Sequence, residues 1–223
     1  MRAELPTAVL WDMDGTLIDS QPIWIRSQTA LVTEFGGTWT YSDGLTLVGV
    51  SMDQVARALQ DAGVQLGGGE LIQRVIDRVI TSLKTAVPWL PGGLELVTAL
   101  GLSGVPQAIV TSAPAAVAHT IVEMLPPGTI GAIVADDHVS SSKPHPEPYL
   151  TAAHALGIPP SDCIAVEDSH AGLAAAIAAG CIAVGVPRDV ALDVPGCWTK
   201  LESLVGVGVQ DLAAIARSGN LRG

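Results

Sequence analysis

Short, continuously apolar segments of β-strand length recur along the chain. They cover residues 8–11, 107–110, 131–134, 163–166 and 181–186. Apolar positions that run without alternation indicate strands covered on both faces, as in a parallel sheet between helices. Helical patterns of about 10–13 residues separate the later segments, as parallel crossovers require. The pattern predicts an α/β fold with a doubly wound parallel sheet, and helices at about 169–179, from Ser112 to Leu125, and from the Pro146–Pro148 region to Gly157.

The interval between the first and second segments has a different pattern. No strand is predicted from residue 18 to 86, and helical periodicity covers about 22–35, 51–63 and 69–85. Ser51 and Gln54 have the spacing of a capping box for the second of these helices. A parallel crossover needs only about a dozen residues. We therefore expect an inserted all-helical domain at residues 18–86, with residues 1–17 and 87–223 forming the sheet domain and 88–92 the return hinge.

Composition excludes several classes of protein. The chain has 11 basic and 22 acidic residues, a net charge of −11, and its basic residues are spread singly, so we expect no nucleic-acid partner. The uncharged stretch at 171–187 is interrupted by glycines and short for a membrane span, so we expect a soluble, cytoplasmic protein without a membrane partner. Cys163, Cys181 and Cys197 fit neither a disulfide framework nor a zinc site, and we expect each to be a buried thiol.

The first predicted strand ends in a pair of carboxylates, Asp12 and Asp14. Residues two apart on an extended segment point to the same side, so both carboxylates are aimed at one place. Two close negative charges need a cation between them or a shared proton. One could then act as nucleophile or metal ligand and the other as acid or base, with Gly15 allowing the sharp turn. A solvated acidic turn is the alternative interpretation.

Three further segments place polar groups where later strands end, the edge at which open α/β sheets bind ligands. Thr111 and Ser112 offer hydroxyl and amide donors to an anion, or simply a helix N-cap. Lys143 is followed by a proline that stiffens its loop and could position the ammonium, and an ordinary surface lysine is the alternative interpretation. Glu167 and Asp168 add carboxylate oxygens, and hard oxygen ligands favour Mg²⁺.

Taken together, these segments resemble the four motifs of haloacid dehalogenase superfamily phosphatases, in the β-phosphoglucomutase and phosphoglycolate phosphatase-like subgroup with a helical cap. The motifs are DMDGT at 12–16, the Thr111 segment, Lys143-Pro144 and Glu167-Asp168. The flanking sequences IDSQP (18–22), PGG (91–93), KPHPEPY (143–149) and EDSHAGLAAAIAAG (167–180) match as well. The resemblance extends to about residue 190 and implies a Rossmann-like core domain with the helical insert as its cap.

The resemblance assigns roles to the residues of these motifs. Asp12 would attack phosphorus to form an aspartyl-phosphate, and Asp14 would protonate the leaving alkoxide and then activate water. Thr111 would hold a phosphoryl oxygen, and Lys143 would offset negative charge. Mg²⁺ would be bound by Asp12, the backbone carbonyl of Asp14, and Asp168, with Glu167 a further candidate ligand. The remaining phosphate-binding candidates are Gly15, Thr16 and Ser112.

The resemblance also bears on the substrate. The cap would cover the leaving group of a small phosphorylated metabolite, such as a sugar phosphate, a polyol phosphate or phosphoglycolate, and Gln21, Trp24 and Met52 are candidate contacts. We expect a monomer or a weak homodimer. A β-phosphoglucomutase-like mutase is one alternative, but such mutases have His at the position of Trp24 and Arg at that of Met52, so hydrolysis is favoured. A phospho-accepting signalling module is a second alternative, although such modules lack both the second carboxylate and the helical insert.

Overall fold

The computed structural model describes residues 5–188 and 191–220 and divides them into two compact units. One unit contains the described residues up to Asp19 and from Trp89 onward, and the other is Ser20–Pro88. We call them the sheet unit and the helical unit. Their junctions lie two residues later at each end than the limits expected from the sequence. Residues 1–4, 189–190 and 221–223 of the expected sheet domain lie outside the described residues.

The sheet unit is built on a six-stranded parallel sheet of order β3-β2-β1-β4-β5-β6. Its strands are β1 (Ala8–Trp11), β2 (Gln107–Val110), β3 (Ala132–Val134), β4 (Cys163–Glu167), β5 (Ile182–Gly185) and β6 (Thr199–Lys200). Every residue of β1, β2 and β4 is buried, which explains why these strands are apolar apart from Gln107 at the start of β2 and Glu167 at the end of β4. Trp11 is paired in register with Ile109 on one side and Val166 on the other, so these three strands end at one level.

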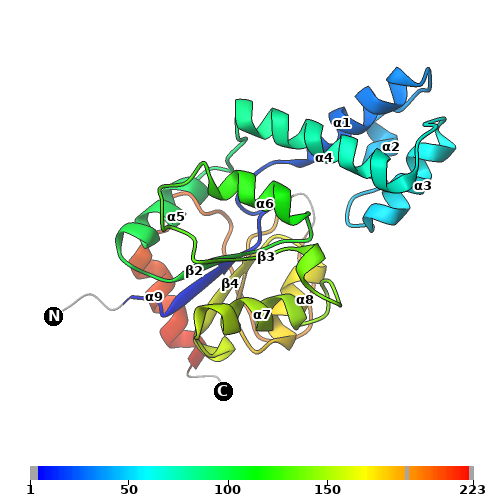
Figure 1. Ribbon diagram of the computed structural model, residues 1–223. Helices are drawn as coiled ribbons and strands as arrows, with labels where there is room; N and C mark the ends of the chain where they lie inside the picture. Colours follow the sequence, from blue (N-terminus) through cyan, green and yellow to red (C-terminus); the bar gives the residue numbers. More distant parts are fainter. Residues whose placement is uncertain (1–4, 189–190, 221–223) are drawn as a thin grey trace. The chain divides into compact units, whose positions relative to one another are not determined.

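Helices cover both faces of this sheet, as the order of strands requires (Figure 1). Along the chain they are α5 (Gly93–Leu102), α6 (Ala115–Val122), α7 (Glu147–Leu156), α8 (His170–Ala178) and α9 (Val209–Asn220). Helices α7 and α8 pack on one face, and α5 and α6 lie on the other. Two short 3₁₀ helices, Asp136–His138 and Pro160–Asp162, occur in the connections. The predicted α/β fold with a doubly wound parallel sheet is therefore confirmed.

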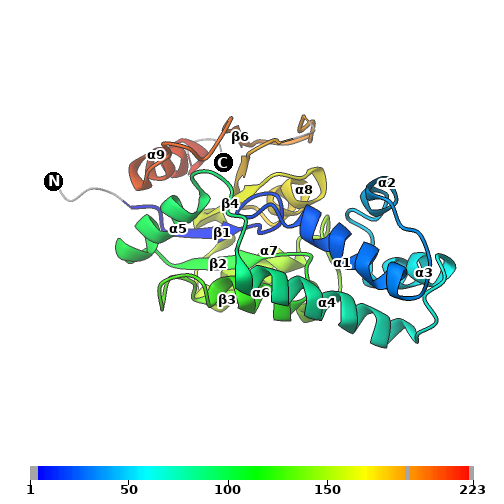
Figure 2. The ribbon, with the colours of Figure 1, turned by 90° about the horizontal axis from the view of Figure 1, so that it is seen from above.

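The helical unit contains α1 (Gln21–Glu34), α2 (Tyr41–Leu45), α3 (Met52–Asp61) and α4 (Gly68–Thr85). Helices α1 and α4 run alongside each other, and α3 also packs on α4 (Figure 2). The buried side chains of α4 include Leu71, Val75, Val79 and Leu83, a four-residue spacing that puts them on one side of the helix. The capping box predicted from Ser51 and Gln54 is present at the start of α3.

Some details of the sequence prediction were wrong. Ser112 does not cap α6, whose N-cap is Pro114, and α6 ends at Val122 rather than Leu125. A helix beginning after Ser112 would force Ala113 into helical geometry directly before a proline, which is sterically disfavoured. Helices α2, α5 and α9 and the short strand β6 were not predicted, and Cys197 is exposed rather than buried. Within the described residues, no helix combines the length and the apolar character needed to cross a membrane.

Candidate active site

The carboxyl ends of β1, β2 and β4 bring together the residues that the sequence singled out. Asp12 directly follows β1 and is only 6% exposed. Met13 is fully buried and Asp14 is half-buried. The backbone then turns through Gly15, whose φ is +96°. A Cβ there would lie 1.9 Å from Oδ2 of Asp168, so glycine is required by the close approach of that carboxylate.

The side chain of Lys143 is almost completely buried among three acceptors. Its Nζ lies 2.8 Å from Oδ1 of Asp12, 2.8 Å from the carbonyl oxygen of Val110 and 2.6 Å from Oε1 of Glu167. An ammonium group has three protons to donate, so these contacts use all of them. The expectation of a positioned ammonium thus agrees with the geometry, in which Lys143 bridges the ends of β1, β2 and β4.

Glu167 is fully buried at the end of β4 and is held by several donors. Its Oε1 accepts from Lys143 and, at 2.5 Å, from the hydroxyl of Tyr149 on α7. Its Oε2 accepts from the hydroxyl of Ser169 at 3.1 Å, and that hydroxyl in turn caps α8 by accepting from the Gly172 amide. Any Cβ on Gly172 would collide with this carboxylate, so α8 packs directly against it. Glu167 is therefore anchored by the protein from two helices.

The charges of this cluster shift one another's protonation equilibria. Burial is the largest influence on Lys143 and lowers its pKa, but Asp12 and Glu167 together outweigh it and raise the pKa above its ordinary value. Burial and the negative charge of Asp12 raise the pKa of Glu167, against the opposing effect of Lys143. Burial, followed by the charges of Asp12 and Glu167, raises the pKa of Asp168 to about 8. The pKa of Tyr149 is raised well above its usual value by burial and by Glu167, so its hydroxyl remains a donor.

Asp12, Glu167 and Asp168 form a group that could hold a cation. One carboxylate oxygen of each lies within 4.8 Å of the others, and the Lys143 ammonium pairs with two of the three, Asp12 and Glu167. The Oδ2 atom of Asp12 is buried and has no hydrogen-bond partner among the described residues. A buried carboxylate oxygen without a hydrogen-bond partner fits a hard divalent cation such as Mg²⁺, which prefers oxygen ligands. Because both oxygens of Glu167 already accept hydrogen bonds, Asp12 and Asp168 are the better placed ligands.

The remaining candidates of the sheet unit lie around the same edge. The hydroxyl of Thr111 donates to Oδ2 of Asp14 at 3.0 Å and accepts from the Ala113 amide. Thr16 is 3% exposed, and its hydroxyl has no partner among the described residues. Ser112 is exposed in the loop between β2 and α6. The structure thus joins Thr111 to Asp14 directly, a contact that the sequence did not predict.

Gln21, Trp24 and Met52 belong to the helical unit. Gln21 begins α1, Trp24 lies on the same helix and Met52 begins α3, and all three are half-buried. Their expected contact with a substrate stays a prediction.

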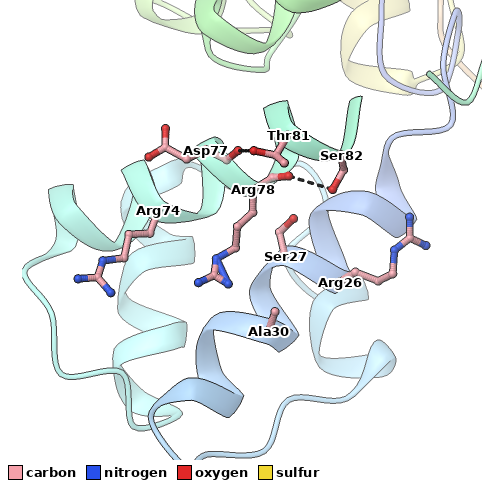
Figure 3. Close-up of a pocket in the computed structure, with 8 residues that line it drawn as sticks. All are labelled: Arg26, Ser27, Ala30, Arg74, Asp77, Arg78, Thr81 and Ser82. Carbon is pink, nitrogen blue, oxygen red and sulfur yellow. Dashed lines mark hydrogen bonds between the residues drawn. The ribbon is translucent and has the colours of Figure 1, made fainter. Parts of the chain in front are cut away.

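A cavity of about 490 Å³ in the helical unit is a separate feature (Figure 3). It lies between α1 and α4, and two of its arginines are already engaged: Arg74 is 2.8 Å from Glu70 and Arg78 is 2.6 Å from Glu34. The hydroxyl of Ser82 donates to the backbone carbonyl of Arg78 (Figure 3). None of the carboxylates at the sheet edge lines this cavity, so we do not identify it with the active site.

Two residues of the site were not identified from the sequence. Tyr149 was quoted within a motif but given no role, although it is one of only two tyrosines and follows Lys143 at the start of a helix. Arg188 lies beyond β5 and pairs with Asp19 at 3.3 Å, and its charge opposes the rise in the pKa of Asp168. No sequence signal marks Arg188, because its pairing joins loops 169 residues apart.

Comparison with known proteins shows the family of the chain and supports its fold. A family model described as haloacid dehalogenase-like hydrolase matches residues 9–186. Hexitol phosphatase B of Escherichia coli (strain K12) is 30% identical over 212 residues, covering 92% of this chain and 96% of the relative. Hexitol phosphatase A of the same organism is 31% identical over 190 residues, covering 81% of this chain and 83% of the relative. CbbY of Rhodobacter sphaeroides, solved in complex with phosphate, has a TM-score of 0.79 at 24% identity, covering 92% of this chain and 97% of that one, and supports the fold.

The family match and the phosphatase relatives therefore define an enzyme of the hydrolase class. The chain belongs to the haloacid dehalogenase-like hydrolase family, as its motifs predicted. The predicted relationship to phosphatases of this family is confirmed by relatives that are themselves phosphatases.

Proposed function

We propose that this protein is a Mg²⁺-dependent phosphatase that hydrolyses small sugar or polyol phosphates through an aspartyl-phosphate on Asp12. The observation that carries the proposal is the state of the Asp12 carboxylate. One oxygen is fixed by the Lys143 ammonium at 2.8 Å, and the other is buried without a partner among the described residues. Such a carboxylate is oriented and poorly solvated, as a nucleophile must be.

The reaction has two steps, and Asp14 is central to both. In the first, an oxygen of Asp12 bonds to phosphorus while the ester P–O bond breaks, and Asp14 gives its proton to the departing alkoxide. In the second, Asp14 takes a proton from a water molecule whose oxygen attacks phosphorus, releasing phosphate and restoring the Asp12 carboxylate. The Thr111 hydroxyl, 3.0 Å from Asp14 Oδ2, supports this role because it orients the acid–base group.

Charge neutralisation comes from the groups around Asp12. Lys143 offsets negative charge on Asp12 and on the phosphoryl group, and Thr111, Ser112 and the turn at Gly15 and Thr16 would contact phosphoryl oxygens. Asp12, Asp168 and the backbone carbonyl of Asp14 would hold the ion, with Glu167 as a further candidate. When bound, the ion supplies positive charge that lowers the cost of bringing a phosphate against carboxylates.

The substrate class rests on the relatives and on the helical unit. The curated relatives named above are hexitol phosphatases, which supports a compact polyol or sugar phosphate as substrate. We propose that the helical unit acts as a cap that covers the leaving group, with Gln21, Trp24 and Met52 as contacts. Trp24 and Met52 occupy the positions at which the mutases have His and Arg, which supports water as the phosphoryl acceptor. A monomer or weak homodimer in the cytoplasm remains part of this proposal.

The test is the Asp12→Asn variant, assayed for phosphate release on a panel of sugar, polyol and two-carbon acid phosphates with and without Mg²⁺. We expect turnover to fall by at least about a thousandfold with an unchanged circular dichroism spectrum, because an amide is not a nucleophile here. Asp61→Asn at the exposed end of α3 is the control and should hydrolyse at the wild-type rate. Normal hydrolysis by Asp12→Asn would refute the proposal, and a product that retains its phosphate would indicate a mutase.

A further inference from the structure

Tyr149 contacts the cluster from its buried side, out of reach of solvent. It is fully buried, and its hydroxyl donates to Oε1 of Glu167 at 2.5 Å. The Nζ atom of Lys143 lies 5.3 Å from the centroid of its ring, within the range of a cation–π contact. One aromatic side chain on α7 thus contacts both partners of the Lys143–Glu167 ion pair.

We propose that Tyr149 is a positioning residue that fixes the Glu167 carboxylate and, through it, holds the Lys143 ammonium against Asp12. The effect that we expect on kcat rests on the function proposed above, whereas the effect that we expect on the Lys143 ammonium does not. The proposal gives the buried glutamate a role as the anchor of the lysine.

The hydrogen bonds form a continuous chain that carries this argument. The Gly172 amide donates to Ser169, Ser169 donates to Oε2 of Glu167, and Lys143 and Tyr149 both donate to Oε1. Apart from the lysine itself, Glu167 is therefore held by one donor from the start of α8 and one from α7. Among the described residues, removing the tyrosine hydroxyl would leave Ser169 as the single side-chain donor to Glu167 besides Lys143, so the carboxylate could rotate and take the ammonium with it.

A purely structural role for Tyr149 is the competing interpretation. Its ring is part of the apolar core between the sheet and α7 and α8. Tyr149→Phe separates the two interpretations, because phenylalanine keeps the ring and its packing and removes only the hydroxyl. Thr120→Val is a matched control: Thr120 is 4% exposed, and its hydroxyl donates to the Ala116 carbonyl on α6 at 2.9 Å, away from the site.

Steady-state kinetics give the first readout. We expect kcat of Tyr149→Phe to fall about tenfold with KM within about twofold of wild type, as for a lost hydrogen bond to a charged group that positions a reacting side chain. Thr120→Val should retain the wild-type kcat. Equal losses of kcat in both variants, or no loss in Tyr149→Phe, would overturn the proposal.

The second readout needs no substrate. The chain has three lysines, of which Lys84 and Lys200 are exposed, so in protein labelled with ¹⁵N-lysine the buried ammonium of Lys143 should give the one slowly exchanging NζH₃ signal. Lys143→Met identifies it by its disappearance. We expect the signal to be weakened or lost in Tyr149→Phe and retained in Thr120→Val. An unchanged signal in Tyr149→Phe would overturn the proposal. If the wild-type protein hydrolyses nothing on the panel, the proposed function fails, and this measurement still decides the role of Tyr149.

Discussion

The ammonium nitrogen of Lys143 lies 2.8 Å from Oδ1 of Asp12, although the two residues are 131 positions apart in the chain. Asp12 follows the central strand β1, whereas Lys143 lies in the loop before α7. The contact places one ammonium group among three carboxyl groups, those of Asp12, Glu167 and Asp168. This arrangement and the burial of the groups involved have consequences that can be measured.

Replacement of Lys143 by methionine should destabilise the protein strongly. The substitution leaves Asp12 and Glu167 buried without their cation, and removing one partner of a buried ion pair costs about 3–5 kcal/mol. Urea unfolding in metal-free buffer at pH 8 measures the effect. Lys200→Met is the matched control, because Lys200 is half exposed and pairs with the exposed Glu202, a contact worth about 0–1 kcal/mol. A Lys143→Met variant as stable as this control would contradict the burial described here.

Gly15→Ala should impair binding of divalent ions. The new Cβ would strike Oδ2 of Asp168, so either the turn or the carboxylate must move. Gly63→Ala separates this clash from backbone strain, since Gly63 has a comparable φ of +106° and no neighbouring atom within 4 Å of the place that the new methyl group would take. We expect both variants to lose about 1–3 kcal/mol from strain. Only Gly15→Ala should lose at least about tenfold in Mg²⁺ affinity by calorimetric titration, and equal affinities in the two variants would refute the explanation.

Stability of the metal-free protein should fall as pH rises through the window from about 4 to about 8. The pKa of Asp168 in the folded protein is raised to about 8 from an ordinary 3.8, so within this window the folded state holds a proton that the unfolded state has lost. The contribution of this proton to the free energy of unfolding is fully present below the ordinary pKa and is lost as pH rises to the raised pKa. The free energy falls by at most about 1.4 kcal/mol per pH unit. Urea unfolding across this window measures the slope, and Asp168→Asn, which cannot titrate, should lack this contribution. Identical slopes in the two proteins would contradict the raised pKa.

The same linkage makes divalent-ion affinity depend on pH. Because the ion displaces the Asp168 proton, affinity should increase by up to about tenfold per pH unit and level off above about pH 8. Calorimetric titration in two buffers of different ionisation enthalpy measures the released proton. Ion binding without proton release at pH 6.5 would count against this linkage.

The three cysteines should differ in reactivity. Burial raises the pKa of the Cys163 thiol to about 11 and that of Cys181 to about 12, whereas Cys197 is exposed. Since the thiolate is the reactive form, a chromogenic disulfide at pH 8 should modify one thiol in the native protein and three in denaturant. Cys197→Ser should abolish the native reaction, and rapid modification of a second thiol would contradict the burial of β4 and of the start of β5.

All the strands of the described residues except β6, and most of the helices, could be predicted from the sequence because their determinants are local. A strand covered on both faces is mostly apolar, as 108–110 and 163–166 are, and the capping box of Ser51 and Gln54 acts within one helical turn. The prediction from the Asp12–Asp14 spacing was also local, since alternation along an extended segment depends on two residues alone. The predicted start of α6 was wrong for an equally local reason: Ala113 directly precedes Pro114, and a residue before a proline disfavours helical geometry.

Only the tertiary structure decided what the buried groups do to one another. Sequence reasoning treated Glu167 as a candidate metal ligand, whereas folding directs both of its oxygens to Lys143, Tyr149 and Ser169, which come from different loops and helices. Arg188 and Asp19 meet across 169 positions in the same way. Hydrogen bonding and desolvation depend on distances of a few ångströms between segments that are remote in the chain, and no local pattern of residues encodes those distances.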